Sequence, residues 1–275
     1  MFRRTDGRLA KVAPYRRMMP FLMKGRNESA VLFEQTVDLS RALPWLAAWN
    51  ARPDRAGKAT VFHLVLHALA SLLHERPRLN RFVAGSRVYD REGVWLSFAA
   101  KKQMHDDAPI ATIKRAFPAD ESFAAMVAAM TSDIGEARTD RPSTIDRELA
   151  ILLRLPRPLL GAAVALLHRL DAVGLAPKAL TASDPMYASA FVANLGSLKI
   201  DAAYHHLFEH GNCPLFATIG QIAPRPFAKD DGTVELRPAL ILRYTYDERI
   251  EDGFYCAQSL AILQRHLEEP AGWIA

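Results

Sequence analysis

Cysteine is scarce in this chain of 275 residues, which contains only Cys213 and Cys256. Two cysteines so far apart form neither a metal-binding spacing nor a disulfide framework, so we expect no bound metal and a reducing compartment. The N-terminus lacks the apolar segment of a signal peptide, and the run "PLLGAAVALL" is about half as long as a bilayer span requires. We therefore expect a soluble, cytoplasmic protein that does not enter a membrane.

The chain also lacks a strong excess of charge of one sign. Its formal net charge is +5, and only "MFRRTDGRLAK" and "YRR" near the N-terminus are locally basic. Dispersed charge of this kind argues against nucleic-acid binding, although a mildly basic surface suits a small anionic ligand. Repeats and low-complexity tracts are absent too, and no break in composition marks a domain boundary. The composition indicates one globular domain.

Hydrophobic periodicity predicts an α/β protein with a mixed sheet, because strands are separated by long helices and hairpins. The clearest helix lies between Thr60, a suitable N-cap, and Pro77, which ends it. The segment "SRVYDREGVWLSFAAKK" predicts a hairpin with "DREG" as its turn, and "AKDDGTVEL" predicts a second turn. Further strands are expected at 29–39, 187–196, 213–222 and 238–247, and further helices at 40–51, 121–137 and 253–267.

The region 142–184 has a different character. It contains two leucine-rich helical segments, "DRELAILLRL" and "RPLLGAAVALLHRLDAVGL", separated by Pro156 and Pro158. Arginines flank their apolar faces, so this region could cover a channel, pack on a partner or bind a membrane surface. We favour plain hydrophobic packing within a helical insertion.

Four segments in the same order carry a resemblance to a known family. The strand "LILRYTY" ends in "DERIEDG", Asp247 to Gly253, and the resembling family ends the same strand in "DHRxxDG". The other three segments are "YRRMMPFLMKGRNESAVLFEQTVDLS", "PRLNRFVAG" with "LSFAAKK", and "FVANLGSLKIDAAYHHL" with "CPLFATIGQI". Together they resemble the chloramphenicol acetyltransferase superfamily, and most of all the catalytic domain of the dihydrolipoamide acyltransferases of 2-oxo acid dehydrogenase complexes.

The resemblance implies a two-layer α/β sandwich with a mixed sheet that assembles as a homotrimer. It further implies active sites at the subunit interfaces, where coenzyme A or acyl-CoA meets an acyl acceptor, either a small molecule or a lipoyl-type thiol. The whole of 1–275 would be a single acyltransferase-like catalytic domain, with an N-terminal arm at 1–13 and the insertion at 142–184. No lipoyl or subunit-binding domain is recognisable in the sequence.

The family's catalytic histidine, which removes the proton of the acceptor, is replaced here by Glu248. Imidazole suits that task because its pKa lies near working pH. An ordinary carboxylate has a pKa about two units lower, so proton abstraction loses roughly 3 kcal/mol of driving force. Burial of a carboxyl group recovers part of that loss. Glu248 is therefore a candidate base of altered strength, or a group that binds a cation.

The family's second helper is a serine or threonine hydroxyl just before "NLG", which stabilises the tetrahedral oxyanion. Here Ala193 occupies that place, while Asn194 and Ser197 flank it as other possible donors. Loss of one oxyanion donor typically lowers the rate by ~10²–10³. Ordinary histidine-dependent acetyl transfer is accordingly not expected.

The resemblance also assigns a positioning role to Asp252. In the family this aspartate pairs with an arginine near the N-terminus, and the matching residue here is Arg16, with Arg17 as the alternative. Gly253 then allows a tight turn into the last helix.

The remaining histidines and Cys256 have competing interpretations. His63, His67 and His74 share one helix face, and we expect them to pack there because no further zinc-ligand motif follows. His205 and His206 lie in the loop between two site-forming strands and are candidate substitute bases, as is His210 further along. Cys256 lacks an evident base partner and is expected to be a small buried apolar residue.

Two functional hypotheses follow. The first is an acyltransferase that handles a coenzyme A thioester or a similar thioester, with Glu248 or a loop histidine as base. The second is a catalytically inactive relative that serves as a binding or scaffolding subunit.

Overall fold

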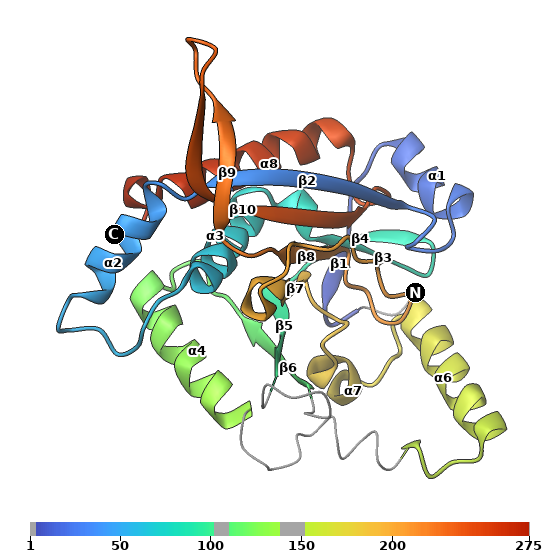
Figure 1. The fold of residues 1–275 in the computed structure, drawn as a ribbon. Coiled ribbons are helices and arrows are strands. Elements are labelled where there is room, and N and C mark those ends of the chain that lie inside the picture. Colours follow the sequence, from blue (N-terminus) through green and yellow to red (C-terminus); the bar gives the residue numbers. More distant parts are fainter. Residues whose placement is uncertain (1–3, 102–109, 138–151, 275) are drawn as a thin grey trace.

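The computed structural model describes residues 4–101, 110–137 and 152–274, and its centre is a large mixed sheet (Figure 1). Within those residues the sheet has seven strands, six of them in the order β2-β10-β8-β7-β5-β6, with β9 paired to β10 alone. Strand β7 runs parallel to both β5 and β8, and the other pairs are antiparallel. The strands are β2 (Ala30–Asp38), β5 (Trp95–Lys101), β6 (Ile110–Ala116), β7 (Ala190–Asn194), β8 (Leu215–Ile219), β9 (Ala223–Ala228) and β10 (Val234–Asp247).

A second, three-stranded sheet contains the N-terminal segment. Strand β1 (Gly7–Leu9) pairs with β4 (Arg87–Arg91), which pairs in turn with β3 (Arg81–Ala84). The described part of the expected N-terminal arm is thus folded onto the body of the protein. Buried Arg4 anchors it through Asp6 and Asp171.

The hairpin predicted around "DREG" is wrong. Strands β4 and β5 do not pair; β4 joins the small sheet, whereas β5 pairs with β6 and β7 in the large one. The true hairpin is β3–β4, whose turn residues Gly85 and Ser86 have φ values of 53° and 58°. Positive φ at both central positions matches the right-handed twist of the two strands, so "AGSR" was the stronger turn signal.

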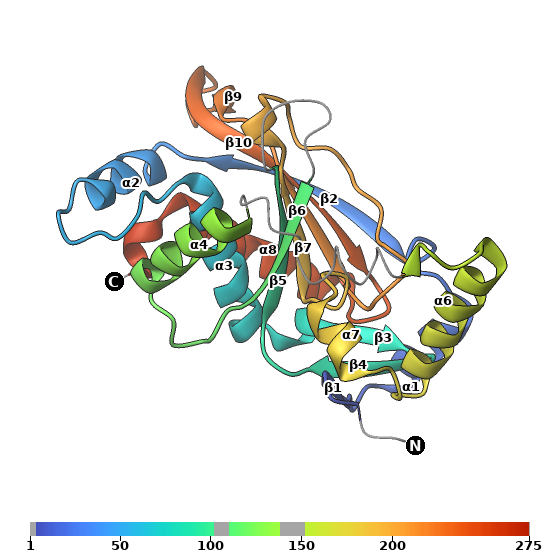
Figure 2. The same ribbon diagram turned by 90° about the horizontal axis from the view of Figure 1, so that it is seen from below.

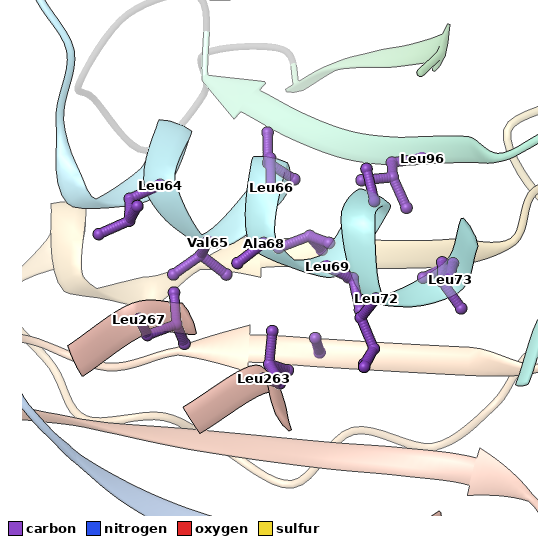
Figure 3. Close-up of a cluster of buried hydrophobic side chains, with 14 of the residues drawn as sticks. Leu64, Val65, Leu66, Ala68, Leu69, Leu72, Leu73, Leu96, Leu263 and Leu267 are labelled. Atoms are coloured by element: carbon purple, nitrogen blue, oxygen red, sulfur yellow. The ribbon is translucent and has the colours of Figure 1, made fainter. Parts of the chain in front are cut away.

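Helices cover one face of the large sheet (Figure 2). Helix α3 (Val61–Glu75) packs against α8 (Gly253–Glu268) and β5, while α4 (Phe123–Ala137) contacts α3 and β6. Leucines of α3 meet Leu263 and Leu267 of α8 and Leu96 of β5 (Figure 3). Helix α2 (Ala42–Asn50) lies beyond them, and the result is the two-layer arrangement expected from the sequence.

Helix α3 begins as the sequence predicted. Thr60 is its N-cap, and the His63 ring accepts from the Thr60 backbone N–H at 3.2 Å to complete a capping box. This closure satisfies donors that the first turn leaves unpaired. Nine residues of the helix, including His63, are buried, because the helix lies in the middle of the core.

The opposite face of the sheet carries a smaller apolar cluster under the loop that joins β7 to β8. Phe191 and Phe216 stack there, 5.1 Å between ring centroids, and Leu207 packs on them from the loop. Because side chains alternate along a strand, Ala193 faces this cluster, while Val192 faces the main core. Short 3₁₀ helices lie at η1 (Pro77–Asn80), η2 (Leu195–Leu198) and η3 (Pro270–Gly272).

Three further helices lie at one side of the molecule (Figure 2). They are α1 (Pro14–Leu22), α6 (Arg157–Ala172) and α7 (Lys178–Ser183), the last two within the predicted insertion. Most of the other predicted insertion helix, "DRELAILLRL", lies outside the described residues. Among the helices that are described, none is both long and apolar enough to span a bilayer.

Candidate functional site

The loop after β10 is held by a buried ion pair. Arg249 and Asp247 are 2% and 0% exposed, and the guanidinium bonds both carboxylate oxygens at 2.8 and 2.7 Å. Its remaining nitrogen, Nη1, donates to the backbone carbonyls of Met23 and Lys24. A bidentate buried pair in which all three guanidinium nitrogens donate fixes the loop against the segment that follows α1.

Glu248 lies between these two residues and is held by its backbone. Its N–H donates to the Ser29 carbonyl at 2.9 Å, and its own carbonyl accepts from Arg16 Nη1. The side chain is half-buried, and the described residues give its carboxylate no hydrogen bond or ion pair. The loop thus presents a carboxylate that is positioned through its main chain and left without an intramolecular partner.

The expected pair between Arg16 and Asp252 is not formed. Arg16 instead lies 3.8 Å from Glu251, whose side chain is buried. Asp252 is exposed and accepts from the Tyr255 backbone N–H at 2.9 Å as the N-cap of α8. The capping role explains the difference, because an aspartate that caps a helix directs its oxygens to the first turn rather than across the loop.

Glu251 is a buried residue of this loop that the sequence did not single out. Arg81 bonds its carboxylate at 2.9 Å, and Arg78 approaches within 3.7 Å. Both arginines lie in "PRLNRF", where two cations three residues apart were a weak signal for a shared anionic partner. This cluster holds the start of α8 against η1 and β3.

The second half of the predicted site lies at the opposite end of the sheet. Ala193 is level with Thr218 of β8, and Thr218 is level with Arg243 of β10. Glu248 is five residues further along, so the two sites are separated by roughly 16 Å along the strand direction at about 3.3 Å per residue. One chain alone does not bring Ala193 and Asn194 to Glu248.

Asn194 is a local cap in this structure. Its side-chain oxygen accepts from the Ser197 backbone N–H at 3.3 Å, and the Ser197 hydroxyl donates to the Asn194 carbonyl at 2.8 Å. Among the described residues the Asn194 amide nitrogen has no hydrogen-bond partner, so it remains able to donate. The Ser197 hydroxyl is already used.

His205 and His206 lie on the loop-covered face of the sheet. The His205 ring stacks on Phe216, 3.8 Å between centroids, and its backbone carbonyl accepts from the Thr245 hydroxyl. The Nδ1 atoms of His205 and His206 each contact a backbone carbonyl of the next residue in the loop. Of the two candidate substitute bases, His206 is exposed and His205 is half-buried.

The α3 histidines are packing residues, as expected. Burial lowers the pKa of His67 to about 4, and its ring stacks on Trp273. His74 Nε2 contacts the Phe117 carbonyl at 2.7 Å. Across the part of the chain that is described, no group of three histidine, cysteine, aspartate or glutamate residues could hold a metal ion.

Cys256 is likewise a core residue. It is 3% exposed, and burial raises the pKa of its thiol to about 12. A thiol with that pKa is not a nucleophile at neutral pH.

Comparison with solved structures yields the same architecture. A probable dihydrolipoamide acetyltransferase from Listeria monocytogenes 4b F2365 superposes with a TM-score of 0.63 at 17% identity, covering 94% of both chains. A dihydrolipoamide acetyltransferase of Azotobacter vinelandii gives 0.62 at 18% identity over 96% of this chain and 93% of that one. A chloramphenicol acetyltransferase gives 0.53 at 14% identity over 96% and 98%.

Sequence comparison adds nothing to these structural matches. No family model and no curated protein matches the chain. The predicted fold is nevertheless confirmed: the chain has the chloramphenicol acetyltransferase-like, acyltransferase-type α/β fold, in a divergent form.

Proposed function

We propose that this protein handles an acyl group carried as a thioester on coenzyme A or a similar thiol. The observation that carries the proposal is the free carboxylate of Glu248 on a loop whose frame is complete. Asp247, Arg249 and Arg16 hold that loop through buried or half-buried bonds. A carboxylate that is fixed through its main chain and has no partner among the described residues is available to bind a ligand or to remove its proton.

The active site of the proposed enzyme is formed between subunits of a homotrimer. Support comes from the separation of Glu248 and Asn194 at opposite ends of the sheet, which a neighbouring copy would remove. The A. vinelandii structure was described for the roles of a serine, a histidine and an asparagine in its mechanism. In our proposal, Glu248 takes the role of that histidine.

In the proposed reaction, Glu248 removes the proton of an acceptor thiol or hydroxyl. The resulting anion attacks the thioester carbonyl, the carbon–sulfur bond breaks, and the departing thiolate takes the proton back from Glu248. The Asn194 amide of a neighbouring copy is the proposed donor to the tetrahedral oxyanion, because Ala193 offers no hydroxyl.

The same alanine favours a second candidate, a non-catalytic binding subunit. Ala193 packs against the Phe191–Phe216 cluster and contributes no polar atom from its side chain. In this alternative the fold and trimer are kept for assembly or ligand binding, and thioesters are bound without turnover.

Acetyl-transfer and thioesterase assays with coenzyme A thioesters separate these candidates. The proteins are the wild type, Glu248→Gln, Glu248→His and the double variant Glu248→His, Ala193→Ser. Wild-type activity that falls at least a hundredfold in Glu248→Gln, with folding unchanged by circular dichroism, supports the carboxylate base. A matched control is Glu92→Gln, an exposed carboxylate of the small-sheet side that should keep full activity.

An inert wild type that becomes active only in the double variant would overturn the enzyme proposal in favour of the binding subunit. Analytical ultracentrifugation tests the assembly. A catalytically active monomer would overturn the interface site, because one chain leaves Glu248 and Asn194 far apart.

A further inference from the structure

A polar pocket of about 200 Å³ lies beside the DERIEDG loop and has no part in the proposed reaction. It is enclosed by the segment after α1, the β3–β4 turn, α6 and the loop before β8. Its charged or polar lining residues include Lys24, Arg26, His168, Asp171, Tyr187 and Glu209. The volume is sufficient for a small ligand or for one charged group of a larger one.

Arg26 places a buried positive charge in the pocket wall. Its guanidinium donates to the backbone carbonyls of Phe208, Glu209, Val83 and Gly211. Within the described residues it forms no salt bridge, and burial lowers its pKa. Its hydrogen bonds all go to backbone carbonyls, and the nearby carboxylates of Asp247 and Glu209 are themselves bonded to other donors. An anion in the pocket would therefore add favourable charge interactions.

The acidic residues of the lining are already engaged. Asp171 pairs with Arg4 at 2.7 Å. The Glu209 carboxylate accepts from the backbone N–H groups of Arg26 and Asn27, each at 3.0 Å. By contrast, the Lys24 ammonium is exposed and has no partner in the part of the chain that is described. The free groups of the pocket are therefore cationic.

His168 adds a hydrogen-bond donor to the pocket. Two residues outside the pocket influence which of its ring nitrogens carries the proton. Its Nε2 lies 3.0 Å from Nδ1 of His210, and His210 Nε2 lies 2.6 Å from the Asp184 carboxylate. The Asp184 hydrogen bond raises the pKa of His210, while burial and the neighbouring His210 lower that of His168. Where His210 Nδ1 carries the proton of this contact, it donates to His168 Nε2, and the proton of a neutral His168 then lies on Nδ1.

Tyr187 closes the inner side of the pocket. The residue is 4% exposed, and its hydroxyl is buried without a hydrogen-bond partner among the described residues. Burial also raises its pKa, so the group remains a protonated hydroxyl. A buried hydroxyl left unpaired is unfavourable, and a bound ligand or an ordered water would satisfy it.

We propose that this pocket binds a small ligand through an anionic oxygen group, a carboxylate or a phosphate, held by Lys24 and His168 beside the buried Arg26. Asp184 and His210 act as positioning residues that present the outer nitrogen of His168. The inference is independent of the reaction proposed at Glu248, since none of its binding residues belongs to that reaction.

The test is an NMR titration of the full chain with inorganic phosphate and, separately, with acetate, following the histidine imidazole resonances. We expect one of the two anions to bind and to shift the His168 resonances, with the preferred anion identifying the chemical group. Lys24→Gln and His168→Gln should each weaken binding by about tenfold, as loss of a charge-assisted contact implies.

Two nearby exposed residues provide matched controls, Lys178→Gln for the lysine and Arg169→Gln for the neighbour of His168 on α6. Both should bind the anion as the wild type does. His210→Gln should weaken binding and also change the pH dependence of the His168 resonances, which a purely structural role would leave unchanged. Absence of binding by both anions would overturn the proposal, as would binding that survives Lys24→Gln and His168→Gln together.

Discussion

The two parts of the candidate site lie at opposite ends of strand β8 and differ in how their residues are held. At the end that leads into DERIEDG, the Asp247–Arg249 pair and the Glu251 cluster are buried ion pairs, and the expected Arg16–Asp252 pair is absent. At the other end, Ala193 has no hydroxyl, and the Asn194 side chain accepts from the Ser197 N–H of its own 3₁₀ turn, its one hydrogen bond among the described residues. The first end is built from buried charges, the second from half-buried and exposed groups.

The difference indicates which side chains can be substituted without a large loss of stability. Arg249 cannot change without leaving Asp247 buried and unpaired, so its identity is tied to stability. Ala193 and Glu248 are held through their main chains, and their side chains can vary with little structural cost. Residues of the second kind are those whose substitution reports on chemistry rather than folding, and the following experiments test this distinction.

The largest effect is expected for Arg249→Gln. Removal of one partner from a buried pair leaves an uncompensated charge, so the free energy of unfolding should fall by about 3–5 kcal/mol. Urea denaturation followed by circular dichroism measures it. Arg8→Gln breaks an exposed pair with Glu92 and should change stability by less than about 1 kcal/mol. Equal losses in the two variants would contradict the comparison.

Glu251→Gln should be the next most costly substitution. The change removes the charge that faces Arg81, Arg78 and Arg16, while Arg81 retains Asp90 at 2.7 Å. We expect a loss of about 1.5–3 kcal/mol, typical of hydrogen bonds to charged groups. Thermal and urea unfolding provide the measurement. A neutral result would mean that the cluster does not stabilise the start of α8.

The two caps offer a direct contrast between the ends. Asp252→Ala removes the N-cap of α8, a helix of 16 residues, and should cost about 1 kcal/mol. Asn194→Ala removes the cap of η2, which has four residues and none buried, and should cost about 0.5 kcal/mol or less. Both are read from urea midpoints under one set of conditions. A larger loss for Asn194→Ala would reverse our ranking of the two ends.

Ala193→Ser should have the smallest effect on stability, about 0.5 kcal/mol or less, because the site is only half-buried. The Ala193→Ser variant is informative mainly in the assay of thioester turnover. If Asn194 of a neighbouring copy already serves the oxyanion, the added hydroxyl should raise thioester turnover only modestly. A gain of a hundredfold or more would instead show that the missing hydroxyl limited the reaction.

Much of the fold followed from short-range features of the sequence. Thr60 and His63 cap α3 as their spacing indicates, and the apolar periodicity of that helix places its leucines in the core. The final strand and helix also lie where "LILRYTY" and "DERIEDG" predicted them. The β4–β5 hairpin failed because two turn signals, "AGS" and "DREG", compete within one short stretch, and only strand pairing decides between them.

The sequence proposed residues for the candidate site but did not predict their contacts. Asp252 was placed opposite Arg16 by analogy, whereas its position at the start of α8 commits it to capping. Glu251 was missed because nothing local distinguishes a carboxylate that meets arginines 170 residues away. The pocket beside α6 depends in the same way on His168 and His210, which are 42 residues apart.

The sequence by itself determined most of the order of helices and strands, the cap that begins α3, and the presence of Glu248 and Ala193 at the two positions singled out by resemblance. These depend on periodicity, side-chain chemistry and hydrogen bonds that span a few residues. Only the tertiary structure decided that Arg16 meets Glu251 and that Glu248 and Ala193 lie at opposite ends of the sheet. Such contacts are set by strand register and helix packing, where residues distant in sequence compete for the same buried space.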